Sequence, residues 1–219
     1  MKLQVNKMAY PVTTLGPGRR MALWVQGCSR ECPGCASTDM WDYAGGVAIE
    51  VEELAAQIAD AVVAERLEGL SISGGEPAEQ AEGLAELVQM ARERIASRRD
   101  GVEVPFDVLV FSGYTRAEIE GRFGALARSV DAMVCGPYDQ ARPRANRLVA
   151  TGNQELVIVN ENVRDRFDAY VQGPERALQF DVEGDAVSMV GMPDAGDLEL
   201  FAKKLAERGV ILGDASWRR

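Results

Sequence analysis

Three cysteines close together in the segment GCSRECPGC (residues 27–35) are the residues of this chain that are best suited to chemistry. Cys28, Cys32 and Cys35 can each bind, as thiolates, one iron of a [4Fe–4S] cluster. Three ligands leave the fourth iron without a protein ligand, much as catalytic metal sites keep one position open. The spacing therefore predicts a cluster with one iron that is free to bind a reactant.

Other roles for clustered cysteines fit this sequence less well. A structural zinc site needs a fourth ligand, and because the chain has no His, Cys135 or a carboxylate would have to supply it. A disulfide framework is typical of small secreted domains, whereas this chain has 219 residues and four Cys. Inert buried thiols are common singly but not three together in a loop with Gly and Pro. We expect Cys135 to be an unpaired thiol of the core.

The composition is that of a folded, acidic protein. With 219 residues, 47% of them hydrophobic, the chain can bury a substantial core. We expect one domain over residues 1–219, with its core at about 20–160 and a C-terminal hairpin and helix at 175–219 that complete or extend it. The net charge of −10 repels polyanions, so no nucleic-acid partner is expected. No run approaches the ~18 apolar residues of a membrane span and no signal peptide is visible, so we expect a cytoplasmic protein without a membrane partner.

Alternating strands and helices have to position the cysteines. The apolar run 21–27 leads directly into the cysteine segment and predicts a buried strand. Further strands are expected at 69–75, 106–113, 130–136 and 155–160, and helices at 51–67, at 78–96 and after Thr115 as N-cap. Near the end we expect a hairpin that turns at Gly184 and Asp185, then a helix over 197–209 with Gly209 at its C-terminal cap.

This repeated strand–helix pattern implies an α/β fold with parallel strands and right-handed crossovers. Functional sites in such folds collect at the carboxyl ends of the strands, which meet at one edge. In this chain those ends carry polar or Gly-rich segments, at 27–35, 73–77, 112–114, 135–138 and Asn160. We expect these five segments to converge.

Two of these segments resemble the signatures of a known superfamily. GCSRECPGC resembles the cysteine motif of radical S-adenosylmethionine enzymes, and SGGEP (73–77) resembles their second signature, which receives the methionine part of the cofactor. Together with FSGYT (111–115), CGPYD (135–139) and TGNQ (151–154), the CPGC motif is similar to that of anaerobic ribonucleotide reductase activating enzymes and other glycyl-radical-enzyme activases. The resemblance implies an incomplete βα barrel of mostly parallel strands.

The same resemblance implies a reaction and its cofactors. The open iron of the [4Fe–4S] cluster would bind S-adenosylmethionine, and one electron from a donor such as flavodoxin or ferredoxin would cleave it to a 5′-deoxyadenosyl radical. That radical would abstract hydrogen from a backbone Gly of a partner glycyl-radical enzyme. Glu76 is the expected partner of the cofactor's ammonium group. The other expected cofactor-binding residues are Gly34, Gly74, Gly75, Pro77, Ser112 and Gly113, and no side chain is assigned to acid–base catalysis.

Other functions stay open on the sequence. The same radical chemistry could act on a peptide or a small molecule. A protein of another class, an electron-transfer protein or a zinc-stabilised binding module, would have no use for the GGEP segment. The aromatic residues after the cysteines, Trp41 and Tyr43, are expected to fill core rather than cover a cluster.

Overall fold

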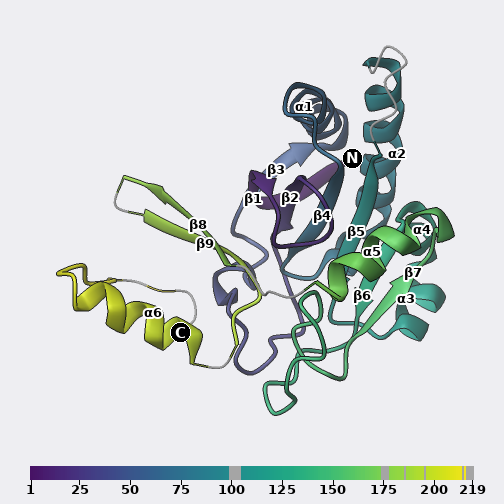
Figure 1. The fold of residues 1–219 in the computed structure, drawn as a ribbon. Helices are drawn as coiled ribbons and strands as arrows, with labels where there is room; N and C mark the ends of the chain where they lie inside the picture. The colour runs from purple at the N-terminus through teal and green to yellow at the C-terminus, as the bar shows by residue number, and fades with distance from the viewer. Residues whose placement is uncertain (99–104, 174–177, 185, 195, 214, 216–219) are drawn as a thin grey trace.

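A seven-stranded mixed sheet forms the centre of the structure (Figure 1). The computed structural model describes residues 1–98, 105–173, 178–184, 186–194, 196–213 and 215. In sheet order the strands are β3 (Val47–Glu50), β1 (Lys2–Val12), β2 (Arg20–Val25), β4 (Gly69–Gly74), β5 (Asp107–Ser112), β6 (Ala132–Cys135) and β7 (Glu155–Ile158). β3 and β7 are open edges. The α/β class is therefore confirmed, and the unclosed sheet is consistent with an incomplete barrel.

Only the central strands of this sheet are parallel. β2, β4, β5 and β6 run parallel as predicted, whereas β1, β3 and β7 are antiparallel to their neighbours. The sequence analysis missed β1 and β3. The connection from β1 to β2 spans only residues 13–19, which is too short for the dozen or more residues that a parallel crossover requires.

The direction of β7 corrects one prediction about the site. Residues 136–154 return from the end of β6 without forming a helix, so β7 pairs antiparallel with β6. Asn160 therefore lies at the opposite edge of the sheet, where its side chain donates a hydrogen bond to Asp131 Oδ1 at 2.8 Å. The expectation that Asn160 joins the functional edge is wrong. Gln154, at the other end of β7, lies there instead.

Helices cover both faces of the sheet. They are α1 (Val51–Ala64), α2 (Ala81–Arg98), α3 (Arg116–Arg122), α4 (Gly124–Ser129) and α5 (Arg164–Val171), with short 3-10 helices η1 (Thr38–Met40), η2 (Pro77–Gln80) and η3 (Glu161–Val163). The start of α3 is as predicted, because Thr115 forms a capping box with Glu118. The short helices α4 and α5 were not predicted. No helix in the described part of the chain is long and apolar enough to cross a membrane.

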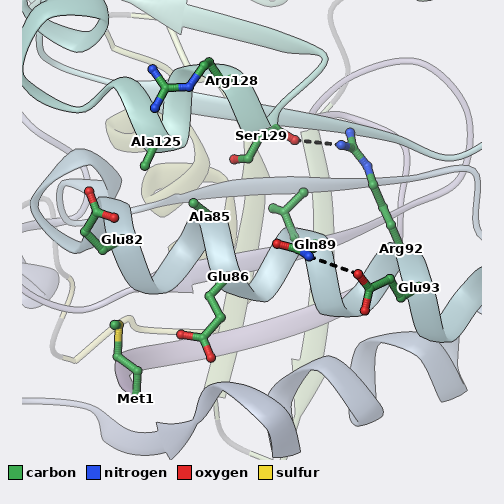
Figure 2. Close-up of a pocket in the computed structure, with 11 residues that line it drawn as sticks. Met1, Glu82, Ala85, Glu86, Gln89, Arg92, Glu93, Ala125, Arg128 and Ser129 are labelled. Atoms are coloured by element: carbon green, nitrogen blue, oxygen red, sulfur yellow. Dashed lines mark hydrogen bonds between the residues drawn. The ribbon is translucent and has the colours of Figure 1, made fainter.

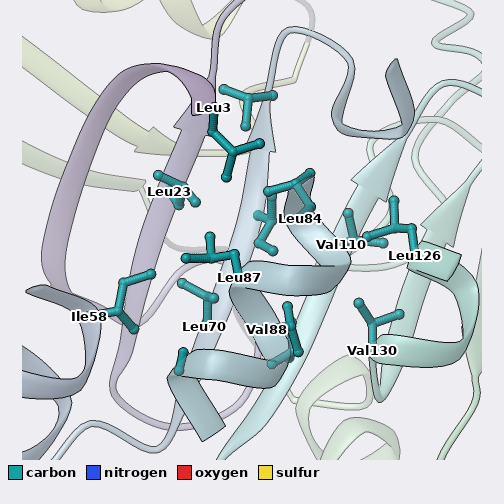
Figure 3. Packing of buried hydrophobic residues seen from close by; sticks show 14 of the residues in the cluster. Leu3, Leu23, Ile58, Leu70, Leu84, Leu87, Val88, Val110, Leu126 and Val130 are labelled. Atoms are coloured by element: carbon teal, nitrogen blue, oxygen red, sulfur yellow. The ribbon is translucent and has the colours of Figure 1, made fainter. Parts of the chain in front are cut away.

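Strand β5 shows how the sheet separates two cores. Val108 and Val110 point to the face covered by α1 to α4, where Leu87 of α2 packs (Figure 3). Leu109, between them, points to the other face and packs with Phe167 of α5. All five side chains are buried, and each contributes about 1.5–3 kcal/mol of hydrophobic stabilisation. This packing holds the carboxyl ends of the parallel strands in line.

A buried ion pair fixes the amino ends of the same strands. Arg20 begins β2 and Asp107 begins β5, and Arg20 Nη2 lies 2.7 Å from Asp107 Oδ1. Arg20 Nε also donates to Ser71 Oγ at 2.7 Å, and Arg166 of α5 donates to Asp107 Oδ2 at 2.8 Å. Arg20 and Asp107 are both fully buried, and removing one partner of such a pair costs about 3–5 kcal/mol. The pair lies far along the strands from the cysteines, so it supports the fold rather than the site.

A C-terminal unit projects from the main sheet (Figure 1). It contains the hairpin β8 (Leu178–Glu183) and β9 (Ala186–Gly191), which form their own two-stranded sheet, and α6 (Asp197–Ala206). The predicted hairpin is confirmed: Gly184 has φ +62, whereas Asp185 lies outside the described residues. α6 ends at Ala206 with Glu207 as its C-cap, earlier than the predicted end at 209, and Gly209, with φ +80, lies in the turn that follows the helix. That the unit shares one domain with the sheet stays a prediction.

Candidate functional site

A cavity of about 1270 Å³ lies at the carboxyl ends of the parallel strands. The predicted site residues that line it are Cys28, Cys32, Gly34, Cys35, Gly74, Gly75, Glu76, Ser112 and Gly113. Of the predicted set, Pro77 alone does not, because it is buried at the start of η2. The cavity forms here because β2, β4 and β5 end at the same edge of the sheet.

The cysteine loop is anchored by main-chain hydrogen bonds. At its start, Gly27 N–H donates to Met40 O at 2.9 Å. Within it, Cys35 N–H donates to Cys32 O at 3.1 Å across a tight turn in which Gly34 has φ +78. A side chain at that φ is strained, so the turn accounts for the glycine before the third cysteine. The loop thus presents three cysteines from one compact segment.

Burial and nearby donors act in opposite directions on these thiols. Burial raises the pKa of the Cys28 and Cys35 thiols above their ordinary value. Backbone N–H groups near Cys28, and the Ser37 N–H and Trp41 side chain near Cys35, partly offset this rise. All four cysteines of the chain are free thiols. Donors of this kind stabilise a thiolate, the form that binds iron.

The thiols do not meet at one point. Among the described residues, no group of three or more His, Cys, Asp or Glu side chains could hold a single metal ion. Cysteines that bind separate corners of an iron–sulfur cube need only face one shared space, which the three loop cysteines do because all of them line the cavity.

Two glycines at the end of β4, Gly74 and Gly75, let this strand pack against the cysteine loop. Gly75 N–H donates to Val25 O at 2.8 Å, and Glu76 N–H donates to Gly27 O at 2.8 Å. A Cβ at Gly75 would lie 2.2 Å from Gly27 O, closer than any real contact. Gly74 has φ +115. We expected both glycines to bind the cofactor, and the close approach that they make in the structure is toward the backbone at the end of β2 and of the cysteine loop.

Glu76 joins the ends of β4 and β5. Its Oε1 accepts hydrogen bonds from Ser112 Oγ at 2.6 Å and Ala78 N–H at 3.0 Å, and its Oε2 accepts one from Gly113 N–H at 2.7 Å. The residue is only 2% exposed, and burial raises the pKa of its carboxyl. Because Oε2 accepts one bond, it retains capacity for another donor. Sequence reasoning found Glu76, Ser112 and Gly113 separately but not this connection.

Glu79 was missed by the sequence analysis. Its carboxylate accepts hydrogen bonds from Ser29 N–H at 3.3 Å, from Tyr114 Oη at 3.2 Å, and from Ser29 Oγ and Tyr43 Oη. Ser29 follows the first cysteine, so Glu79 holds the cysteine loop against η2. The only signal was position: Glu79 lies three residues after Glu76, which is one turn of a 3-10 helix.

The aromatic residues after the cysteines differ from prediction in part. Tyr43 is 55% exposed, so the expectation that it fills core is wrong. Burial of its hydroxyl and the hydrogen bond to Glu79 raise the pKa of Tyr43 to about 12. Trp41 is half-buried and lines the cavity, so it is part of the cavity wall rather than of the core.

Arg30 places a cation in the same cavity. Its guanidinium carbon lies 4.7 Å from the centre of the Tyr114 ring, and the side chain lines the cavity. Its Nε is buried and, within the described structure, has no hydrogen-bond partner. A buried donor without a partner is costly, so Arg30 is suited to an anionic group in the cavity.

Cys135 lies apart from the other cysteines. It ends β6, is 1% exposed and packs in the core between sheet and helices. Burial raises the pKa of its thiol to about 12, and it does not line the cavity. The prediction of an unpaired core thiol is confirmed, so Cys135 is not placed to supply a fourth ligand.

A second cavity, of about 650 Å³, lies between α2 and α4 (Figure 2). It contains none of the predicted site residues. Two of its polar side chains make hydrogen bonds within it: Arg92 donates to the backbone oxygen of Ser129 at 2.8 Å, and Gln89 donates to Glu93 at 3.0 Å. Nothing in it resembles a reaction centre.

Comparisons with known proteins agree with the chemistry of the large cavity. The family model described as 4Fe-4S single cluster domain matches residues 14–157. The anaerobic ribonucleoside-triphosphate reductase-activating protein of Vibrio cholerae serotype O1 is 32% identical over 142 residues, which are 61% of this chain and 85% of the relative. Its counterpart in Pasteurella multocida is 30% identical over 157 residues, 68% of this chain and 92% of the relative.

A solved structure, QueE from Escherichia coli, aligns with 52% of this chain and 54% of its own at a TM-score of 0.40 and 18% identity. A likeness of that size supports no assignment. The family match and the sequence relatives support an assignment: this chain belongs to the 4Fe-4S single cluster domain family and is related to the anaerobic ribonucleoside-triphosphate reductase-activating proteins.

Proposed function

We propose that this chain is a radical S-adenosylmethionine enzyme that activates a glycyl-radical enzyme by abstracting hydrogen from a backbone Gly. One observation carries the proposal: the three cysteines of the loop and the GGE segment, about 40 residues further along the chain, line the same cavity. The relatives are named as activating proteins of an anaerobic ribonucleoside-triphosphate reductase. A reductase of that type is the partner that we propose here.

The residues of the cavity fit both groups that this function requires. Cys28, Cys32 and Cys35 would hold three irons of a [4Fe–4S] cluster, and Cys135 is too deep in the core to bind the fourth. Glu76 would take the ammonium group of S-adenosylmethionine at Oε2, and the unpaired Nε of Arg30 is a donor for its carboxylate. When bound, the two groups supply a 5′-deoxyadenosyl radical on reduction by one electron.

The task of the chain's own residues is to bind, orient and shield. Glu79 and the glycine pair hold the cysteine loop in place, and Trp41 and Phe111 supply apolar wall to the cavity. Excluding water from such a site prevents side reactions of a reactive intermediate. The chain has no His, and the proposed chemistry needs no acid or base from the protein. A flavodoxin or ferredoxin as electron donor and a cytoplasmic location both stay predictions.

The test is anaerobic reconstitution of the full chain with iron and sulfide, followed by S-adenosylmethionine, dithionite and chromatography for 5′-deoxyadenosine. Wild type should bind about four irons and release 5′-deoxyadenosine. Addition of an anaerobic ribonucleoside-triphosphate reductase should then produce a glycyl radical signal in electron paramagnetic resonance. A fully reconstituted, reduced chain that never cleaves the cofactor would refute the enzymatic proposal.

The control for this test is a pair of cysteine variants. A triple Cys→Ala variant of the loop should release no 5′-deoxyadenosine. Cys135→Ala should release as much as wild type, because this thiol lies outside the cavity. Cofactor cleavage without any radical on the reductase would support the radical chemistry and would indicate that the substrate is a peptide or a small molecule instead.

A further inference from the structure

Tyr114 connects Arg30, a cation of the large cavity, to the carboxylate that clamps the cysteine loop. The centre of its ring lies 4.7 Å from the guanidinium carbon of Arg30, and its hydroxyl donates a hydrogen bond to Glu79 Oε1 at 3.2 Å. Glu79 also accepts a hydrogen bond at 3.3 Å from the N–H of Ser29, the residue before Arg30. These four residues form a closed ring of contacts that holds both the main chain and the side chain of Arg30.

Tyr114 is itself fixed in the core. It is 8% exposed and belongs to the buried cluster between the sheet and helices α1 to α4. Phe123 packs against it with ring centres 5.1 Å apart, and the guanidinium carbon of Arg122 lies 5.3 Å from its ring centre. An arginine side chain has many rotamers, so a fixed ring beside it restricts a group that would otherwise be mobile.

This support places Arg30 next to the carboxylate of Glu76. A Cβ built on Gly113 would lie 3.0 Å from Arg30 Nε and 3.2 Å from Glu76 Oε2, so the cation and the carboxylate border the same small space. They do not bond to each other, because Arg30 Nε has no hydrogen-bond partner in the described part of the chain. An unpaired donor and an acceptor with remaining capacity thus face one space.

Such an arrangement matches the charged end of a free α-amino acid. The ammonium and the carboxylate of that end are carried by one carbon, so the groups that bind them must lie close together without neutralising each other. A guanidinium suits the carboxylate, and a carboxylate suits the ammonium. S-adenosylmethionine has such an end, and the loop cysteines that would hold the cluster line the same cavity as Arg30 and Glu76.

We infer that Tyr114 is a positioning residue for the cofactor: it holds Arg30 beside Glu76, so that the carboxylate of S-adenosylmethionine meets a cation already in place. The inference rests on the proposed function and names the residue on which the orientation of the cofactor's amino-acid part depends. Tyr114 is not among the described residues that line the cavity, so it acts through Arg30. Holding the arginine in advance removes the entropic cost of ordering it when the cofactor binds.

A double-mutant cycle on the full, reconstituted chain tests this inference. Calorimetry gives the Kd of S-adenosylmethionine for wild type, Arg30→Gln, Tyr114→Leu and the double variant, after iron and sulfide have been measured in each. Arg30→Gln should raise Kd about tenfold or more, and Tyr114→Leu should raise it about three- to tenfold. In the Arg30→Gln background, Tyr114→Leu should add less than about twofold, because its partner is already gone. A merely structural role would weaken binding in both backgrounds.

Three further variants separate positioning from packing. Tyr114→Phe keeps the ring beside Arg30 and should stay within about threefold of the wild-type Kd. Arg122→Gln is the matched control, because it removes the other guanidinium at this ring, which does not line the described cavity. Its Kd should stay within about twofold of wild type. Tyr114→Met fills the core with a flexible apolar side chain and replaces Tyr114→Leu in the cycle if that variant loses its cluster.

The wild-type chain gives a second readout that no variant can disturb. With nitrogen-15-labelled arginine, the Nε–H signal of Arg30, identified by its loss in Arg30→Gln, should shift and exchange more slowly with water when S-adenosylmethionine is added. An unchanged Kd in Arg30→Gln, an unmoved Arg30 signal, or equal losses from the Tyr114 change in both backgrounds would each overturn the inference. Release of 5′-deoxyadenosine by wild type would then leave the proposed function intact, whereas a reconstituted wild type that never binds the cofactor would refute that function as well.

Discussion

Replacement of Glu76 by Gln tests the centre of the site. The Glu76 carboxylate accepts three hydrogen bonds from the ends of β4 and β5. In wild type, Gly113 N–H donates to Glu76 Oε2 at 2.7 Å. In Glu76→Gln the amide oxygen can still accept the hydrogen bonds from Ser112 and Ala78, but the NH₂ group then faces the Gly113 N–H and cannot accept from it. Leaving one buried donor without an acceptor costs about 1–3 kcal/mol. The variant should therefore be folded but measurably less stable in thermal unfolding.

The same change should weaken cofactor binding. If Glu76 receives the ammonium group of S-adenosylmethionine, Glu76→Gln loses a charge-assisted bond of about 1.5–3 kcal/mol, which raises Kd roughly ten- to a hundredfold. Calorimetry on the reconstituted chain measures this. Because burial raises the pKa of Glu76 and the bond needs the ionised form, wild-type affinity should fall as pH falls through that raised pKa. Glu76→Gln should lack this dependence.

Ser112→Ala is the matched control for Glu76→Gln. It removes one donor to the carboxylate and keeps the charge, so it should lose about 1 kcal/mol of stability while its affinity for the cofactor stays within about threefold of wild type. Tight binding of S-adenosylmethionine by a folded, reconstituted Glu76→Gln would show that Glu76 does not bind the cofactor and serves only to connect the ends of the two strands. Equal losses of affinity in both variants would show that the effect is structural.

Three further predictions follow from neighbouring residues. Cys28→Ala should abolish stable cluster assembly, as should the equivalent change at either other loop cysteine. Cys135→Ala should keep iron and sulfide at wild-type levels, and thermal unfolding should show a loss of about 1 kcal/mol of stability. Gly75→Ala should force the cysteine loop away from β4 and speed loss of iron to a chelator, and unchanged loss would contradict the role of the close contact. Glu79→Gln should lower the pKa of Tyr43 from about 12 toward its ordinary value of 10, measured as tyrosinate absorbance. Since the raised pKa belongs to the folded state, the contribution of Tyr43 to stability is complete below pH 10 and is lost as pH rises toward 12.

The sequence predicted which residues line the large cavity better than the way they are held. Motif spacing identified the cysteine loop and Glu76 because their chemistry is local to short segments. Glu79 escaped because its role depends on Ser29, 50 residues away, and no periodicity reports such a pairing. Asn160 was misplaced because strand direction depends on the connection: residues 136–154 contain no helix, so β7 had to return antiparallel.

Two parts of this chain build the large cavity. The cysteine loop and Glu76 lie within residues 14–157, which the family match covers, and they are fixed to the parallel strands by short main-chain contacts. β9 and the segment 210–213 reach the same cavity from outside that range. Under the proposed function, the cysteine loop and Glu76 serve the radical chemistry, whereas the C-terminal unit completes the wall of their cavity. Hence changes to the cysteine loop should abolish release of 5′-deoxyadenosine, whereas changes to β9 should leave that release measurable.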